Sequence, residues 1–594
     1  MIFGNKTEIL SKLTEKKLIA GSDENLAEFL CGLEKNLSSE EKPVFAAAAA
    51  LLSEWVSSGS ICITKNDIET FIKTNRDDLS GTAFPNWEEI KNVMTKSSCC
   101  TQNPENEPTP LVFFADDKIY FYKYWLYENS LAAKVLKLSK DKGKFAENAD
   151  KIKKVFDELF DSESFEQKNA AVTAVENRFS VITGGPGTGK TTTVAKILAG
   201  ILSVYPESSI ILASFTGKAA ARMTEALRGA TEKIEKSGKI ENAAIFAKMN
   251  SLEGLTIHKI LDMSFGKPGR NRQNPITADF VIIDEASMVD IAMFLELLDA
   301  ISGETSLILL GDKDQLASVG VGNVFSDICD AAEDNLFERK IMAKLTKSHR
   351  FDENSGIGKL ASAVNGQKKA HEIIGICEEE CDLNYREIKK ERKNKEIESI
   401  AEYAAKKYEF LSDKDLEPKE ILEKLNDFKI LCPSKEDFFG VDNINTAIEN
   451  ALEIKQSDAF YNGRPVMITK NDYANNLMNG DCGVILKRDG KTKAYFLQGS
   501  MLESFDISKL SAFETVYATT VHKSQGSEYD SAVVILPERE MPMLTKELLY
   551  TAITRAKKKV TIAANKAILE YALGNTAERN SGFKEALKKA GKAL

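Results

Sequence analysis

Residues 179–202, FSVITGGPGTGKTTTVAKILAGIL, decide the fold of this chain. The first five residues are apolar and β-prone, and a helical pattern begins at TTTVAKILAGIL, so a glycine-rich turn joins a strand to a helix. The turn, GGPGTGKT at 184–191, matches the pattern GxxxxGK[ST] in the structural context that this pattern requires. Backbone N–H groups of such a turn, together with the helix N-terminus, cradle phosphate groups. The segment therefore predicts a nucleotide-binding P-loop within an α/β domain.

The side chains around this turn predict ATP and Mg²⁺ as cofactors. Lys190 should reach the β- and γ-phosphates, and Thr191 should ligate Mg²⁺. The apolar strand DFVIID ends in Asp284, followed by Glu285. Asp284 should hold the Mg²⁺ water shell, and Glu285 should orient or deprotonate the attacking water. The alternative, a glycine-rich turn that binds nothing, does not account for the strand, the helix and the full motif together.

Two series of short apolar runs predict two α/β domains. Continuous apolar strands that are bounded by turn residues are typical of parallel sheets covered on both faces. The first series comprises residues 180–183, 210–214, 280–284 and 307–311, and the second comprises 428–432, 532–536 and 560–563. Between the parts of the second series, glycines separate the β-prone segments 465–469, 483–487 and 493–497, which predicts a small antiparallel β insertion. Residues 382–400 carry mixed charge, and we interpret them as an exposed helix.

The first 150 residues carry no readable motif, and helical patterns dominate them. A β-prone piece at 111–124 ends in an aromatic cluster, YFYKYWLY at 120–127. These aromatics could stack on bases, but we favour a core or a partner interface, which aromatic clusters form more often. We expect a helical, partner-docking domain at 1–150, a first α/β domain at 151–340, a second at 341–453 and 517–594, and the β insertion at 454–516.

Composition narrows the class of protein. The net charge of −10 neither supports nor excludes nucleic acid, because a binding groove needs only local positive potential, but it argues against a histone-like coating role. Nine irregularly spaced cysteines predict reduced thiols. The longest apolar run, Val44 to Leu52, has nine residues, whereas about 20 are needed to span a bilayer. The sequence MIFGNKTEIL lacks the features of a secretory signal, so we expect a cytoplasmic protein.

Six further segments, in order, resemble the motifs of superfamily 1 DNA helicases of the RecD group. They are ASFTGKAAARM at 213–223 (motif Ia), TIHKIL at 256–261 (Ib), LLGDKDQLASVGVGNVF at 309–325 (III), LTKSHR at 345–350 (IV), YATTVHKSQGSEYD at 517–530 (V) and LYTAITRAKK at 549–558 (VI). Any one segment could match by chance, but the ordered set, from about Gln167 to the C-terminus, is highly specific. The resemblance implies two RecA-like P-loop domains, an inserted SH3-like β domain and a mostly helical N-terminal domain.

The resemblance also assigns roles to individual residues. Gln167 would read the adenine edge, although its position alone also fits a surface helix residue. Gln315 would sense the γ-phosphate, and Arg350 and Arg555 would reach across the inter-domain cleft as arginine fingers. The full set assigned to the nucleotide is Gln167, Gly184, Gly185, Pro186, Gly187, Thr188, Gly189, Lys190, Thr191, Thr192, Asp284, Gly526 and Glu528, of which Gly526 and Glu528 would link the nucleotide state to the track.

The resemblance implies that the motor moves along DNA, which is its track. The segments that touch DNA in the family contain hydroxyl, imidazole and lysine side chains, which bind phosphates without reading sequence. They are Thr216, Lys218, His258, Thr520, His522 and Lys523, and for Lys218 a solvated lysine is an almost equal alternative.

The implied activity is that of an ATP-dependent DNA helicase. Residues 463–486 resemble the start of the SH3-like insertion of B-type members, which move 5′ to 3′. The resemblance implies the α subunit of an exodeoxyribonuclease V (RecBCD-type) heterotrimer, with RecB-like and RecC-like subunits as partners and with single-stranded DNA and duplex ends as substrates. A solo helicase of the longer RecD-like branch, an RNA helicase and a degenerate ATPase scaffold are the alternatives.

Overall fold

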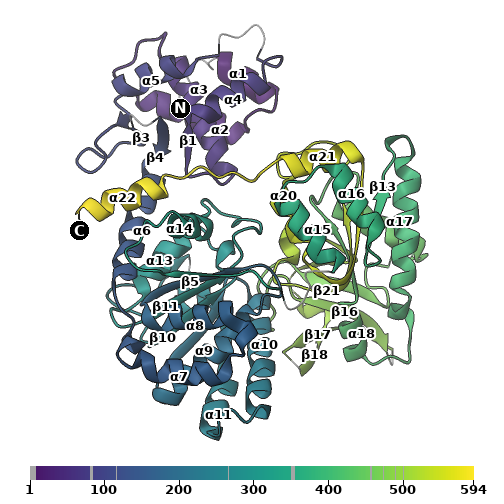
Figure 1. Cartoon of the computed structure of the whole chain (residues 1–594). Coiled ribbons are helices and arrows are strands. Elements are labelled where there is room, and N and C mark those ends of the chain that lie inside the picture. Colours follow the sequence, from purple (N-terminus) through teal and green to yellow (C-terminus); the bar gives the residue numbers. More distant parts are fainter. Residues whose placement is uncertain are drawn as a thin grey trace.

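The computed structural model describes residues 8–79, 84–114, 117–264, 266–348, 355–454, 458–472, 474–488, 490–499, 501–510 and 512–593. Two parallel α/β sheets lie side by side, with an antiparallel insertion beside the second sheet and an N-terminal region above the first (Figure 1). The predicted α/β class with two sheets and a β insertion is confirmed. Among the described residues, no helix combines the length and apolar character needed to cross a membrane.

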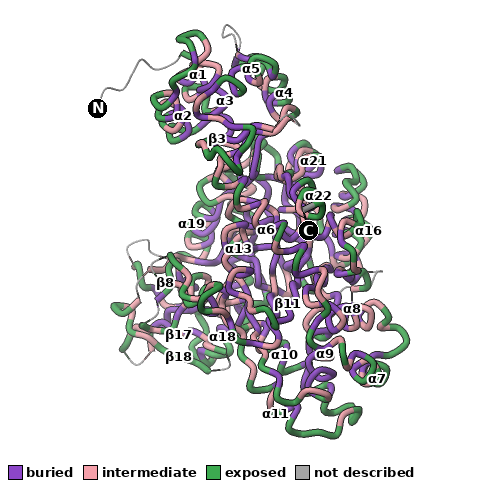
Figure 2. The backbone as a smooth tube through the Cα atoms, turned by 90° about the vertical axis from the view of Figure 1, so that its left-hand side faces the viewer, coloured by how far each residue is buried: buried purple, intermediate pink, exposed green. Residues whose placement is uncertain are grey.

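The first sheet has six parallel strands in the order β12-β5-β11-β10-β6-β7. Neighbouring residues of its central strands point to opposite faces and are buried on both: Val181 packs in one core and Ile182 in the other. This two-sided burial explains why the strands are continuously apolar (Figure 2). The strands are β5 (Phe179–Gly184), β6 (Ile210–Ser214), β7 (Gly254–Thr256), β10 (Phe280–Asp284), β11 (Ser306–Gly311) and β12 (Met342–Leu345).

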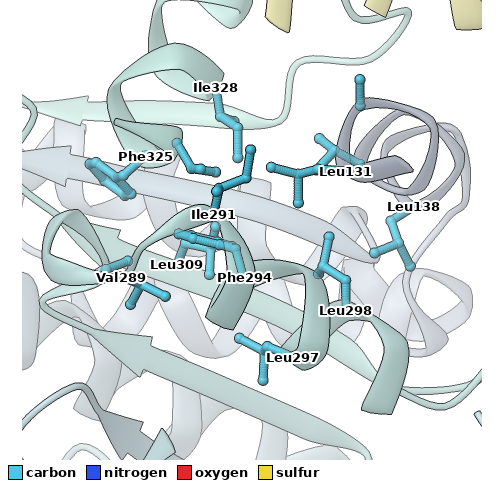
Figure 3. Close-up of a cluster of buried hydrophobic side chains, with 14 of the residues drawn as sticks. Leu131, Leu138, Val289, Ile291, Phe294, Leu297, Leu298, Leu309, Phe325 and Ile328 are labelled. Carbon is cyan, nitrogen blue, oxygen red and sulfur yellow. The ribbon is translucent and has the colours of Figure 1, made fainter. Parts of the chain in front are cut away.

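Helices cover both faces of this sheet. One face packs against α7 (Ala149–Leu159), α8 (Phe165–Glu176), α9 (Lys190–Val204), α10 (Gly217–Lys236) and α11 (Ala243–Ser251). The other face packs against α6 (Tyr122–Lys140), α13 (Ile291–Ala300) and α14 (Val324–Glu333). Figure 3 shows Leu131 and Leu138 of α6 directed toward Ile291 and Leu298 of the α13 segment.

The second sheet has five parallel strands in the order β13-β22-β21-β14-β20. They are β13 (Leu383–Glu387), β14 (Phe428–Cys432), β20 (Ala518–Thr520), β21 (Tyr529–Ile535) and β22 (Ala556–Ala564). One face packs against α15 (Gly356–Asn365), α16 (Ala370–Glu379), α20 (Lys546–Ile553) and α21 (Lys566–Gly574). The other packs against α17 (Lys393–Lys407), α18 (Pro418–Lys424) and α19 (Val441–Ala451).

The interpretation of residues 382–400 as one exposed helix is wrong for its first part. Residues 383–387 form the edge strand β13, paired with β22, and α17 begins only at Lys393. Leu383 of this strand is buried while Asn384 is exposed, the alternation of a half-covered strand. Charged side chains also suit an edge strand, where they discourage pairing with other chains, so charge alone did not distinguish the two structures.

The predicted β insertion is a five-stranded antiparallel sheet in the order β18-β17-β16-β15-β19. Its strands are β15 (Arg464–Ile468), β16 (Cys482–Arg488), β17 (Lys491–Gln498), β18 (Met501–Asp506) and β19 (Phe513–Thr515). A small core of its own includes Val466, Ile485 and Phe496. Val484 and Leu486 instead pack into the core of the second domain, which fixes the insertion to that domain.

The N-terminal region combines helices with a four-stranded sheet in the order β1-β4-β3-β2. Its helices are α1 (Glu8–Glu15), α2 (Gly21–Leu33), α3 (Lys42–Ser57), α4 (Lys65–Thr74) and α5 (Trp87–Lys96), and its strands are β1 (Cys62–Thr64), β2 (Cys100–Thr101), β3 (Leu111–Phe114) and β4 (Lys118–Phe121). Tyr120 and Trp125 of the aromatic cluster are buried in the core that α6 shares with the first sheet. Of the two favoured interpretations, a core or a partner interface, the core is therefore confirmed for Tyr120 and Trp125. The other aromatics of the cluster are partly exposed.

The last helix departs from the expected division of the chain. We expected residues 517–594 to stay with the second domain. Instead, after α21 the chain crosses back, and α22 (Phe583–Ala593) packs on α6 with Phe583 and Leu587 in the shared core (Figure 1). The apolar face of α22 is thereby buried far from the second sheet.

Candidate nucleotide site and inter-domain cleft

The predicted P-loop is a tight turn at the carboxyl end of β5. Gly187 and Gly189 have φ values of +78° and +83°, in the left-handed region that glycine occupies readily. A Cβ on Gly184 would lie 2.7 Å from Thr188 Oγ1 and 2.8 Å from the Leu345 carbonyl oxygen. The glycines are therefore needed for the turn to close over the start of α9, at Lys190.

Polar side chains surround the mouth of this turn. The Lys190 ammonium donates to the carbonyl oxygens of Gly184 (2.5 Å) and Gly185 (3.1 Å). Gln167 lies on α8, and its amide Nε2 donates to the Thr188 carbonyl oxygen at 3.2 Å. Because Gln167 is buried, the alternative of a surface helix residue is wrong.

The acidic pair ends β10 opposite Lys190. The backbone N–H of Glu285 donates to Asp284 Oδ1 at 2.9 Å, and Glu285 has a φ of +52°, which is uncommon for a residue with a side chain. Burial first, and then the charge of Glu285, raise the pKa of Asp284 to about 6, while Lys190 opposes this shift. Asp284 is half-buried, and a carboxylate whose negative charge is disfavoured suits a hard divalent cation; with Thr191 in the first turn of α9, the donors fit Mg²⁺.

The two domains meet at motifs III and VI. Arg555, which precedes β22, is buried and donates from Nη2 to Gln315 Oε1 at 3.2 Å. Its Nε donates to the Thr551 carbonyl oxygen at 3.2 Å, within its own domain. Gln315 in turn donates to Asp312 Oδ2 at 3.0 Å, and the Tyr550 hydroxyl reaches the same oxygen at 3.1 Å. Gln315 and Arg555 are thus brought together across the cleft, beside the P-loop. Arg350 lies outside the described residues.

Motif V also touches the first domain. Gly526 has a φ of +71°, and a Cβ there would lie 3.3 Å from Ala219 Cβ on α10. Glu528 forms an ion pair with Arg222 of α10. Burial, followed by the positive charge of Arg555, lowers the pKa of Arg222, so this arginine lies in the same charged cleft. The sequence analysis did not include Arg222 in the predicted site. Its position one helical turn after Ala219, on the face of α10 that meets motif V, could have indicated it as a site residue.

The predicted DNA residues lie at the carboxyl ends of strands in both sheets. Thr216 caps α10 by accepting from the Ala219 N–H at 3.2 Å. His258 is exposed, with its ring centroid 6.0 Å from that of Phe215. The β6–β7 register pairs Ser214 with Thr256, so motifs Ia and Ib are neighbours.

Motif V supplies the second-domain part of this edge. Thr520 Oγ1 accepts from the Lys523 N–H at 3.2 Å, and the Lys523 ammonium donates to Glu514 at 2.5 Å. Burial first, and then the charge of Arg579, lower the pKa of His522. Lys218 is only partly exposed, and burial opposes its positive charge, so the alternative of a freely solvated lysine is wrong.

Three family models match the chain. An AAA domain matches residues 167–321, a UvrD-like helicase C-terminal domain matches 515–563, and the N-terminal domain of RecBCD enzyme subunit RecD matches 15–120.

Curated relatives match over almost the whole length. RecBCD enzyme subunit RecD of Mycobacterium tuberculosis is 32% identical over 96% of this chain and 95% of its own length. The Haemophilus influenzae RecD subunit is 29% identical over 98% and 99%. The ATP-dependent RecD2 DNA helicase of Deinococcus radiodurans is 28% identical, over 72% of this chain and 52% of its own. A solved structure of Pif1 helicase from Candida albicans superposes with a TM-score of 0.38 and 14% identity, covering 72% of this chain and 99% of its own, which is too loose to argue from. The near-complete matches show that this chain belongs to the family of RecBCD enzyme subunit RecD.

Proposed function

We propose that this chain is an ATP-dependent DNA helicase that moves 5′ to 3′ along single-stranded DNA. The observation that carries the proposal is the hydrogen bond between Arg555 of the second domain and Gln315 of the first, beside a complete P-loop. Side chains from both domains would surround the same phosphates, so ATP binding would favour the closed cleft and hydrolysis would release it.

The residues around the P-loop would divide the chemistry of hydrolysis. Lys190 would bind the β- and γ-phosphates, and Gln167 would read the adenine. Thr191 and Asp284 would hold Mg²⁺, which neutralises developing charge on the phosphate oxygens when it is bound. Glu285 would orient the attacking water.

Residues of the cleft would sense and complete this site. Gln315 would detect the γ-phosphate, while Arg350 and Arg555 would stabilise charge in the transition state. Gly526 and Glu528 contact α10, which begins at motif Ia, and this contact supports a link between nucleotide state and track. Thr216, Lys218, His258, Thr520, His522 and Lys523 would contact DNA phosphates.

The proposed setting is a cytoplasmic RecBCD-type complex with RecB-like and RecC-like partners, acting at DNA ends. The match of residues 15–120 to the N-terminal domain of RecBCD enzyme subunit RecD supports this setting over a solo helicase.

Lys190→Gln in the full chain tests the activity. The variant should keep its thermal unfolding midpoint but lose ATP hydrolysis that is stimulated by single-stranded DNA, since its lost charge faces phosphates and not a core. Lys196→Gln is the matched control: it lies on the same helix, α9, but its ammonium sits over the Phe160 ring at 4.4 Å. Normal turnover by the Lys190 variant would refute the site, and stronger stimulation by RNA than by DNA would refute the track.

A further inference from the structure

The chain crosses from the second domain back to the first through a short extended segment, residues 575–582, which we call the strap. Figure 1 shows the strap running between α21 and α22. On the second-domain side, Asn575 Nδ2 donates to the Leu544 carbonyl oxygen at 2.9 Å, and the Ala577 N–H donates to Glu547 Oε2 at 2.9 Å. The strap is therefore fixed to the second domain as far as Ala577.

Three residues after Ala577 the strap is fixed to other parts of the molecule. Asn580 Nδ2 donates to Asp67 Oδ2 of α4 at 2.8 Å, and its carbonyl oxygen accepts from the Ile61 N–H at 2.9 Å. The Gly582 N–H donates to Glu128 Oε1 of α6 at 2.8 Å. An extended chain spans at most about 7 Å over the two residues from Ala577 to Arg579. Relative movement of the domains at this edge is correspondingly restricted.

Arg579, at the point of crossing, binds the end of motif III. Its Nη1 donates to Ser318 Oγ (3.2 Å) and to the carbonyl oxygens of Gly320 (2.8 Å) and Gly322 (2.9 Å). Its Nη2 donates to the Ser318 carbonyl oxygen at 2.6 Å. Val319, between these partners, is 76% exposed. Val321 packs against the first-domain core, and its carbonyl oxygen accepts from the Ile291 N–H at 3.1 Å, so the loop is anchored at that end. The guanidinium group supplies the side-chain hydrogen bonds that join residues 318–322 to the strap.

The other surroundings of Arg579 join this loop to the rest of the motor. A Cβ on Gly59 of the N-terminal region would lie 2.5 Å from Arg579 Cζ, so the Gly59 backbone lies directly against the guanidinium. The Gly322 N–H donates to the Gly59 carbonyl oxygen at 2.8 Å. Arg579 also contributes to the lowered pKa of His522 in motif V, after burial. Three regions therefore meet at one cation: the strap, the motif III loop and the N-terminal region.

The start of the same loop carries the predicted γ-phosphate sensor. Gln315 accepts from Arg555, and the Leu316 N–H donates to Thr551 Oγ1 at 3.0 Å. Residues 315–322 are thus held at one end by the second domain and at the other by Arg579. A displacement of the loop at Ser318 would be transmitted over three residues to Gln315.

We propose that Arg579 is a positioning residue that fixes the motif III loop between the two domains, so that nucleotide-driven closure is coupled to productive movement. This inference rests on the proposed helicase function. Arg579 has no described contact with Lys190, Thr188 or Gln167, so its loss should affect turnover and coupling and leave ATP affinity intact. A misplacement of about 1 Å in a catalytic assembly can reduce turnover as much as about 100-fold.

Arg579→Ala in the full chain tests the proposal. We expect kcat for DNA-stimulated ATP hydrolysis to fall about tenfold or more, KM for ATP to stay within about twofold, and base pairs unwound per ATP to fall. Lys584→Ala is the matched control, because Lys584 follows the strap and forms only an exposed ion pair with Asp334, at 2.7 Å. If kcat and unwinding per ATP both stay within about twofold of wild type, or if KM for ATP alone changes, the proposal is overturned.

Two measurements separate this outcome from failure of the proposed function. Amide hydrogen exchange within residues 318–322 can be measured without enzymatic activity and should accelerate in Arg579→Ala. Unchanged exchange would overturn the positioning role of Arg579. Arg579→Lys, which keeps a positive charge but cannot reproduce the guanidinium fork that reaches Ser318, Gly320 and Gly322, should give the same changes if Arg579→Ala does not fold. A wild-type chain without DNA-stimulated hydrolysis would instead defeat the proposed function, and the coupling role with it.

Discussion

Arg555 is buried where the two domains meet and divides its hydrogen bonds between them, with Thr551 in its own domain and Gln315 in the other. We expect Arg555→Ala to lower ATP hydrolysis by about 10³-fold or more, since an arginine finger acts mainly on transition-state charge. ATP should still bind, because the contacts of Lys190 within the P-loop are untouched. Single-turnover hydrolysis and binding of a fluorescent ATP analogue would measure the two effects separately.

Gln315→Ala adds a second test at the same contact. If Arg555 and Gln315 act as one unit, the double variant should hydrolyse ATP no more slowly than the worse single variant. Losses that simply multiply would show that the two residues act independently. Near-normal turnover in Arg555→Ala would remove its role as a finger.

Residues within contiguous motifs were the ones that the sequence could predict. Lys190 follows from the P-loop pattern, whereas Gln315 and Arg555 follow from the resemblance to helicase motifs III and VI; the structure brings Gln315 and Arg555 into contact. Arg579 lies in no motif, and its partners, Gly59 and residues 318–322, are far away in the chain, so no local sequence pattern predicts its role. Arg222 lies inside a motif, but its pairing with Glu528 depends on how two domains meet.

Helix α6 is an element of the first domain's core as much as of the N-terminal region. Leu131 is fully buried against α13 (Figure 3), so Leu131→Ala should lower the free energy of unfolding by roughly 2–5 kcal/mol. Leu126→Ala on the same helix should have little effect, because Leu126 is 42% exposed. Chemical denaturation of both variants measures the difference. Equal, small losses would show that α6 is not part of this core.

The contribution of the junction between α6 and the strap to the free energy of unfolding should depend on pH. Burial first, and then the charge of Asp327, raise the pKa of Glu128 to about 8, from an ordinary value of 4.5. The folded protein therefore binds a proton more tightly than the unfolded chain, and the stabilisation present at low pH is lost as pH rises from about 4.5 through about 8.

Glu128→Gln should remove that part of the pH dependence. The amide oxygen of the glutamine can still accept from the Gly582 N–H, but the amide group cannot ionise. At pH 8 the free energy of unfolding of the variant should therefore exceed that of wild type by on the order of a few kcal/mol. Glu398→Gln, exposed on α17, is the control. A wild-type stability that is flat between pH 5 and pH 8 would contradict the assignment. Burial also raises the pKa of Asp327, to about 7. The free energy of unfolding of Glu128→Gln should therefore still depend to some extent on pH.

Elements were predicted well where hydrophobic pattern alone decides them. Apolar runs between turn residues predicted the central strands of both parallel sheets, which are β5, β6, β10, β11, β14, β21 and β22, and the insertion strands β15, β16 and β17. They did not predict the remaining strands β7, β12, β18, β19 and β20. Residues 383–387 were missed because mixed charge suits an edge strand as well as a helix. The position of α22 was missed because an amphipathic helix shows which of its faces is buried, but not which distant element buries it.

At the scale of the whole molecule, the sequence predicts the two α/β sheets and their insertion but not how they are tied together. The chain passes between the domains twice, once between β12 and α15 and once through the strap. The strap and the contact at Arg579 hold the two α/β domains together at one edge. The domains should therefore separate more at the opposite edge than at this one. The insertion is fixed to the second domain through Val484 and Leu486, and should therefore move with it.

The direction of movement is the sharpest test at this scale. The sequence of residues 463–486 resembles the insertion of B-type motors, and Met478 within it lies against Gly217 at the start of α10, so the insertion borders the proposed DNA-binding residues. We expect the full chain with ATP and Mg²⁺ to displace a strand from a duplex with a 5′ single-stranded tail and to leave a 3′-tailed duplex intact. Lys190→Gln should displace neither, which excludes a contaminating helicase. Preference for the 3′ tail would overturn the 5′–3′ assignment while leaving the ATP site unaffected, and displacement by the Lys190 variant would show that the unwinding comes from another protein.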